Sequence, residues 1–226
     1  ADPYWGPAFT FTGIQLTWML LAYGVVASVL PVWLLLAPRD YLSTFLKIGA
    51  IAALAVGILI VAPELKMPAV TKFVDGTGPV WSGNLFPFLF ITIACGAVSG
   101  FHALISSGTT PKLLENEMHA PYIGYGGMLM ESFVAIMALV AASIIEPGVY
   151  FAMNSPAALI GTTPESAAAA ISQWGFMITP EMLTQTAHNV GEATIISRAG
   201  GAPTLAVGMA YIFSEMLGGP GMMAFW

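Results

Sequence analysis

The chain of 226 residues is apolar and poor in charge: 57% of its residues are hydrophobic, 8% are charged, and the net charge is -6. A soluble domain of this size cannot bury so much apolar surface, so the composition indicates a protein of the lipid bilayer. The six Lys and Arg residues form no cluster. This distribution argues against nucleic acid as a partner and against a polybasic lipid anchor.

Five apolar segments are predicted to cross the membrane, because each approaches the roughly 20 residues that a helix needs to span the hydrocarbon core. Between the first and the second, a turn is predicted at Pro38, Arg39 and Asp40. The predicted fold class is therefore an all-α polytopic membrane protein, with one transmembrane domain over the whole chain. The predicted spans cover residues 14–37, 42–62, 85–107, 122–145 and 204–226.

The third predicted span changes character in its second half, where polar side chains and glycines precede Pro111. Backbone that leaves helical geometry inside a membrane persists only where protein or water satisfies it, and such breaks hold ions and solutes in transporters. A half-helix end there would bind a carboxylate through its dipole. The alternative is that the hydroxyl groups only cap the helix. The predicted solute-binding residues are Ser99, His102, Ser106, Ser107, Thr109 and Thr110.

Glu131 is the one ionisable residue of the fourth predicted span and lies near its middle. A carboxylate at that depth costs at least about 2.5 kcal/mol, so it is expected to face a helix bundle or a cavity. We predict that Glu131, together with His102, takes up and releases a coupling proton, since an imidazole exchanges protons near neutral pH. The alternatives are a protonated acid bonded to a neighbouring helix and a neutral imidazole bonded to a backbone carbonyl.

The segment 146–202 is predicted to leave the membrane as a loop with amphipathic helices. Two helix starts are expected at Thr163 and Thr179, because each is followed by Pro and Glu. His188 and Glu192 stand four residues apart, a spacing that suits a metal, but no further ligand lies near them. A solvated polar face is the favoured interpretation, and neither a metal site nor a cofactor is predicted.

The chain starts with Ala1 and ends on an apolar run, which we interpret as an internal fragment of a longer membrane protein. Other helices of that protein are then expected partners. A different hypothesis makes Ser99 an intramembrane nucleophile with His102 or His188 as base. Its surroundings fit no nucleophile elbow, so an intramembrane hydrolase is the lesser alternative and no catalytic residue is predicted.

Long runs of the sequence resemble the carbon starvation protein family, the CstA-type transporters of bacterial inner membranes. The resemblance covers nearly the whole chain and is weakest between residues 155 and 172. It is carried by FPFLFITIACGAVSGFHALISSGTTPKLLENE, IGYGGMLMESFVAIMALVAASIIEPGVYFAMN, DPYWGPA, LPVWLLLAPRDYLSTFLKIG, PELKMPA, DGTGP and RAGGAPTLAVGMA.

This resemblance implies a secondary transporter for peptides or pyruvate, similar to the amino-acid/polyamine/cation group with its inverted repeats and discontinuous helices. It implies a multi-pass protein of the inner membrane that works during carbon starvation and is no enzyme. The expected partners are the solute, protons and the lipid bilayer. A membrane nutrient sensor, which binds a solute without carrying it, is the remaining alternative.

Overall fold

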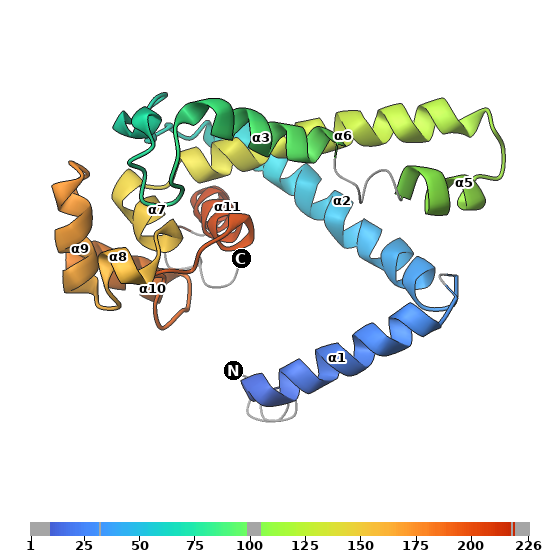
Figure 1. Ribbon diagram of the computed structural model, residues 1–226, viewed down its shortest axis with the longest axis horizontal. Helices are drawn as coiled ribbons and strands as arrows, with labels where there is room; N and C mark the ends of the chain where they lie inside the picture. The colour runs from blue at the N-terminus through green and yellow to red at the C-terminus, as the bar shows by residue number, and fades with distance from the viewer. Residues whose placement is uncertain (1–9, 32, 99–104, 218, 220–226) are drawn as a thin grey trace. The chain divides into compact units, whose positions relative to one another are not determined.

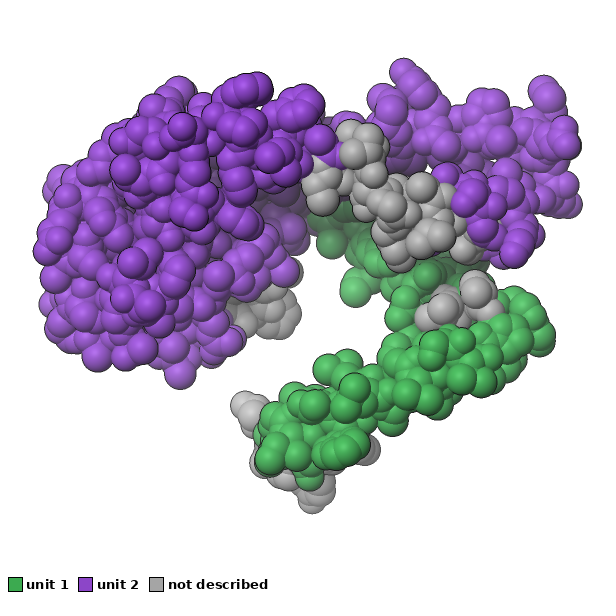
Figure 2. All heavy atoms as spheres, in the orientation of Figure 1, with its two compact units in different colours: residues 1–52 green, residues 53–226 purple. Residues whose placement is uncertain are grey.

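The computed structural model is built from helices (Figure 1). It describes residues 10–31, 33–98, 105–217 and 219, and no strand occurs within these ranges. The all-α prediction is thus confirmed for the described part of the chain. The chain divides into two compact units, residues 1–52 and 53–226, which are coloured separately in Figure 2.

The first unit holds helix α1 (Gly13–Val29) and the beginning of helix α2 (Leu36–Val61). The side chain of Thr12 accepts a hydrogen bond from the backbone N–H of Gln15, and the Gln15 side chain accepts one from Thr12 in return. This capping box satisfies N–H groups that have no partner within the helix.

The predicted turn at Pro38 to Asp40 is wrong, since α2 begins at Leu36 and these residues lie in its first turn. A proline costs little there, because its missing N–H would have no partner within the helix. The guanidinium of Arg39 donates to Asp40 at 2.8 Å and to the Tyr23 hydroxyl at 2.7 Å, which ties α2 to α1 within this unit.

Two described helices are long and apolar enough to cross a membrane, residues 37–61 of α2 and all of helix α6 (His119–Ser143). Helices α1, α3 (Leu85–Val98) and α11 (Gly201–Leu217) are shorter than the spans predicted around them. The described part of α3 is followed, after the range 99–104 that is not described, by a π-helical turn η3 (Ile105–Thr109) and helix α5 (Thr110–Leu113). The count of five spans therefore stays a prediction.

In the second unit, helices α6 and α11 pack together. Gly208 of α11 lies directly against the backbone carbonyl group of Ala141 in α6, a closeness that only a residue without Cβ allows. The side chain of Met137 and those of Val207 and Ile212 are buried around this contact. Small residues thus set the distance between the two helices, as is usual for membrane helix pairs.

Four further helices pack as a group beside α11 (Figure 1): α7 (Pro147–Asn154), α8 (Ala157–Ile160), α9 (Pro164–Gln173) and α10 (Pro180–Asn189). The predicted helix starts are confirmed, because Thr163 and Thr179 cap α9 and α10 by accepting from backbone N–H groups three residues on. In α10 Leu183 and Ala187 are buried. That this helix lies on the membrane surface or on the parent protein stays a prediction.

The connection between α2 and α3 is not a free loop. The backbone N–H groups of Lys66 and Met67 both donate to the carbonyl of Ser143, at 2.9 and 3.0 Å. A 3-10 turn, η2 (Lys72–Asp75), then places Phe73 against Phe151, Trp174 and Phe176 at ring distances of 5.5 to 6.4 Å. The connection is thereby anchored to the end of α6 and to the helix group.

Candidate functional site

Glu131 lies at the centre of α6, and its side chain is exposed. It makes no hydrogen bond or ion pair with any residue in the described ranges. Gly127 and Gly124, one and two turns earlier on this side of the helix, have nothing within 4 Å of an added Cβ. The carboxylate thus stands on an open strip of small residues, the kind of surface that a further helix approaches closely.

Residues 105–110, which we call the hydroxyl segment, leave α-helical geometry in the π turn η3, a form that is rare and frequent at functional sites. Ser106 and Ser107 are exposed, and Thr110 is partly exposed. Two predicted site residues, Ser99 and His102, lie outside the described residues, and Thr109 is described only by its backbone. Among the described residues no hydrogen bond or ion pair joins Glu131 to this segment, so the predicted site stays a prediction.

Helix α10 ends at Asn189, so Glu192 lies in the turn after the helix and not on its predicted solvated face, and there it forms an ion pair. Arg198 donates to Glu192 at 3.2 Å, and both side chains are about half exposed. Gln185 donates to Asn189 at 2.6 Å within the helix. No group of three potential metal ligands occurs among the described residues. The side chains of His188 and Glu192 are exposed.

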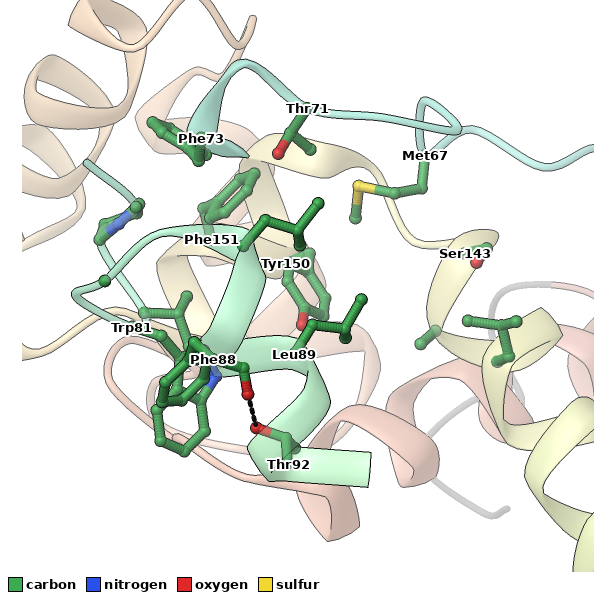
Figure 3. A pocket seen from close by; sticks show the side chains of 17 residues that line it. Met67, Thr71, Phe73, Trp81, Phe88, Leu89, Thr92, Ser143, Tyr150 and Phe151 are labelled. Atoms are coloured by element: carbon green, nitrogen blue, oxygen red, sulfur yellow. Dashed lines mark hydrogen bonds between the residues drawn. The ribbon is translucent and has the colours of Figure 1, made fainter. Parts of the chain in front are cut away.

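A cavity that the sequence did not reveal lies beneath the connection between α2 and α3 (Figure 3). It measures about 420 Å³, and aromatic side chains form much of its wall, among them Phe73, Trp81, Phe88 and Phe151. The Thr92 hydroxyl near its end donates to the Phe88 carbonyl at 3.0 Å and so is satisfied within its own helix. We call this cavity the aromatic lobe.

A second cavity of about 850 Å³ reaches the start of α11. It is lined at that end by Asn154, Ser155, Gly200, Gly201 and Thr204. We call it the polar lobe. The two lobes share part of their walls, since Val80, Trp81, Ala142 and Tyr150 line both. They are therefore neighbouring compartments of one cleft in the second unit.

Asn154 organises the polar end of this cleft. Its amide nitrogen donates to the Tyr150 carbonyl at 3.1 Å and to the Thr204 hydroxyl at 3.0 Å, while its amide oxygen accepts from the Gly200 N–H at 3.2 Å. Gly200 has a φ of +127°, a conformation that favours glycine. Burial raises the pKa of the Tyr150 hydroxyl, which keeps it a neutral group beside the cleft.

Sequence reasoning missed this cleft because its walls come from the connection after α2 and from α3, α6, α7 and α11. No single stretch carries its pattern. The signals that could have pointed to it are the run Arg198 to Thr204, rich in glycine at a helix start, and Asn154 at the end of α7. In the sequence, both stretches stand out only as part of the family resemblance.

Apolar helices with an isolated carboxylate and a partly polar cleft define a helical membrane protein. The family model of the carbon starvation protein CstA matches residues 1–226. The chain therefore belongs to the carbon starvation protein CstA family, as the resemblance predicted. No solved structure gives a significant match.

Curated relatives are similar over the whole chain or nearly so. The peptide transporter CstA of Escherichia coli (strain K12) is 74% identical over 230 residues, which cover 100% of this chain and 33% of the relative. The pyruvate/proton symporter BtsT of the same strain is 62% identical over 238 residues, with 96% and 33% covered. The peptide transporter CstA of Campylobacter jejuni subsp. jejuni serotype O:2 is 63% identical over 227 residues, with 100% and 32% covered.

The chain thus spans about a third of the length of these relatives. All three names are those of transporters and none is that of an enzyme, in agreement with the prediction that the chain is not an enzyme.

Proposed function

We propose that this chain forms part of a secondary transporter that carries a small nutrient, a peptide or pyruvate, into the cell together with protons. The observation that carries the proposal is Glu131, a single carboxylate at the centre of a 25-residue apolar helix, without a partner among the described residues. A charged group at this depth is costly, and such groups almost always face a helix bundle or a water-filled cavity and mark the path of an ion or a solute. The names of the relatives, peptide transporter and pyruvate/proton symporter, support the same class.

In this proposal Glu131 binds a proton from one side of the membrane and releases it to the other, with His102 as a second exchanging group. The hydroxyl segment, with Ser99 and His102 before it, contacts the solute. The π turn at residues 105–109 supports this assignment, because backbone outside α geometry offers groups that a solute can satisfy. Alternating access then moves groups of helices around this place.

The proposal includes the location and the topology of the protein. We place the protein in the bacterial inner membrane as a multi-pass protein, with five spans from this chain and residues 146–202 outside the hydrocarbon core. The exposed apolar surfaces of α1, α2 and α6 then face lipid or other helices, which explains why so many large hydrophobic side chains on them are uncovered.

Two rival functions predict other behaviour. An intramembrane hydrolase would use Ser99 and release a covalent product, and a sensor would bind solute without flux. The relatives with transporter names favour the transporter over both. A serine-directed activity probe that labels Ser99 would favour the hydrolase, and saturable binding without uptake would favour the sensor.

Uptake into proteoliposomes tests the proposal. The protein at its full natural length is reconstituted, and entry of labelled pyruvate and of a labelled dipeptide is followed without an imposed gradient of any ion. Saturable entry of at least one of the two above protein-free liposomes is the expected result. Entry of neither above that background contradicts the assignment as a transporter.

A further inference from the structure

The two lobes of the cleft differ in chemistry. The aromatic lobe is walled by rings and by aliphatic side chains such as Leu89, and the stacked pair Phe151 and Phe176, with centroids 4.6 Å apart, holds that wall in place. Rigid aromatic walls favour an apolar group of a ligand, because they bury its surface at little cost in side-chain entropy. This lobe is suited to a hydrophobic side chain.

The polar lobe ends at the first turn of α11, a helix of 17 residues. The Gly201 N–H is the first of the helix and has no acceptor among the described residues. Pro203 has no N–H to offer, and Thr204 N–H is taken by the Gly200 carbonyl. The helix dipole adds partial positive charge at this end, so an anion is favoured there.

Ser155 supplies an independent sign of a ligand. The residue is completely buried, it lines the polar lobe, and its hydroxyl has no hydrogen-bond partner among the described residues. Its own carbonyl accepts from the Ser197 hydroxyl at 2.9 Å, so the backbone around it is fixed. A buried hydroxyl without a partner costs about 1–3 kcal/mol, and a ligand that bonds to it recovers that cost.

We propose that this cleft binds a small molecule with a carboxylate at one end and a hydrophobic group at the other, the chemistry of a short peptide with an apolar side chain. The carboxylate lies at the start of α11, where it accepts from the Gly201 N–H and from the Ser155 hydroxyl. The hydrophobic group passes Trp81 and Tyr150, which line both lobes, and enters the aromatic lobe. Pyruvate satisfies the polar end but is too small to reach the aromatic one.

This inference rests on the proposed function in one respect, since the ligand is taken to be the transported solute, held in the cleft at one stage of transport and at the hydroxyl segment at another. The cleft is a separate place from the hydroxyl segment, and its occupancy is measured by binding, without transport. We therefore test it by equilibrium binding of labelled Leu-Leu to the protein at its full natural length in lipid nanodiscs. Leu-Leu amide, Gly-Gly and pyruvate serve as unlabelled competitors.

The polar end is tested with a matched pair of substitutions at Gly201. An added Cβ meets nothing within 4 Å there, so Gly201→Ala keeps both the fold and the N–H. Gly201→Pro removes the N–H at a helix position that tolerates proline well. We expect Leu-Leu to bind the proline variant about tenfold more weakly than the alanine variant, the loss expected for one hydrogen bond to a charged group. Equal affinities overturn the assignment of the polar end.

Competition between ligands can be measured on the wild-type protein, so the result does not depend on whether a variant folds. Leu-Leu amide, which lacks the carboxylate, should compete at least tenfold more weakly than unlabelled Leu-Leu. Ser155→Ala should weaken Leu-Leu binding, while the protein without ligand is at least as stable as the wild type because an unpaired buried hydroxyl is removed. An amide that competes as well as the acid overturns the proposal.

The aromatic end is tested with Trp81→Ala, and Trp18→Ala on α1 is the control. The two side chains are similarly exposed, at 65% and 67%, but only Trp81 lines the cleft. Trp81→Ala should weaken Leu-Leu several-fold and leave competition by pyruvate unchanged, and Trp18→Ala should change neither. Equal losses in both variants, or a matching loss for pyruvate, contradict the aromatic end.

Uptake separates a failure of this site from a failure of the proposed function. If Leu-Leu enters proteoliposomes while the two Gly201 variants bind it equally, the result supports the transporter function and refutes this binding site. If Leu-Leu binds with the expected pattern but does not enter proteoliposomes, the result supports the binding site and refutes transport of this ligand.

Discussion

The close contact of α6 and α11 predicts a large effect of one methyl group. In Gly208→Ala the new Cβ would meet the carbonyl oxygen of Ala141, with its carbonyl carbon at 2.6 Å and its Cβ at 3.0 Å. Carbon atoms in contact normally lie about 3.5–4.0 Å apart, so α11 has to move by up to about 1 Å. Two backbones cannot relieve this clash by a change of rotamer.

The expected cost is about 1–3 kcal/mol of unfolding free energy, as for other overpacked cores. It outweighs the gain of about 1 kcal/mol that Gly→Ala brings to a helix by propensity alone. Gly49→Ala on α2 is the control, because its added methyl group meets nothing within 4 Å.

Thermal unfolding in detergent, followed by the remaining monodisperse fraction, compares these variants with the wild type. We expect a lower midpoint for Gly208→Ala and an unchanged or slightly higher one for Gly49→Ala. A Gly208→Ala protein as stable as the wild type would refute the argument that these backbones meet so closely.

Two smaller effects are also expected. Lys66→Ala removes the ion pair with Glu146 (2.7 Å), but this pair is about half exposed and the connection keeps its backbone hydrogen bonds to Ser143. We therefore expect a loss of unfolding free energy below about 1 kcal/mol that becomes smaller as the salt concentration rises. A shift of the thermal midpoint several times larger would show that the side chain anchors the connection. Asp75 accepts from the Thr77 hydroxyl (2.7 Å) and N–H (3.1 Å), and these bonds hold the pKa of Asp75 below its ordinary value of 3.8. The turn is therefore stabilised by these hydrogen bonds above about pH 4, and it loses their stabilisation as pH falls through the lowered pKa. Thr77→Val should raise the pKa of Asp75 in a carboxyl NMR titration. An unchanged titration would show that the Thr77 hydroxyl does not lower this pKa.

Local signals in the sequence predicted local structure well. The starts of α9 and α10 followed from Thr163 and Thr179 because a cap, a proline and an acid act within one turn. The start of α2 was placed too late because Pro38 was interpreted as a break. Proline breaks a helix only where its missing N–H and its ring disturb an earlier turn, and in the first turn there is none.

The site could be predicted only in part. Glu131 is evident because it interrupts an apolar run, but what its carboxylate meets depends on segments that pack against α6, which no periodicity encodes. The cleft is a sharper case. Ser155 becomes a candidate only in the fold, which buries its hydroxyl and places the residue in the wall of the same cavity as Gly201, 46 residues later in the chain.

Proton-driven accumulation tests the central claim most directly. Proteoliposomes hold the wild type, Glu131→Gln or the control Glu117→Gln, whose carboxylate lies in the exposed connection before α6. With an inward proton gradient, the wild type and Glu117→Gln should concentrate the transported solute, while Glu131→Gln should only equilibrate it. Concentration by Glu131→Gln equal to that by the wild type would contradict the role of this carboxylate in proton coupling.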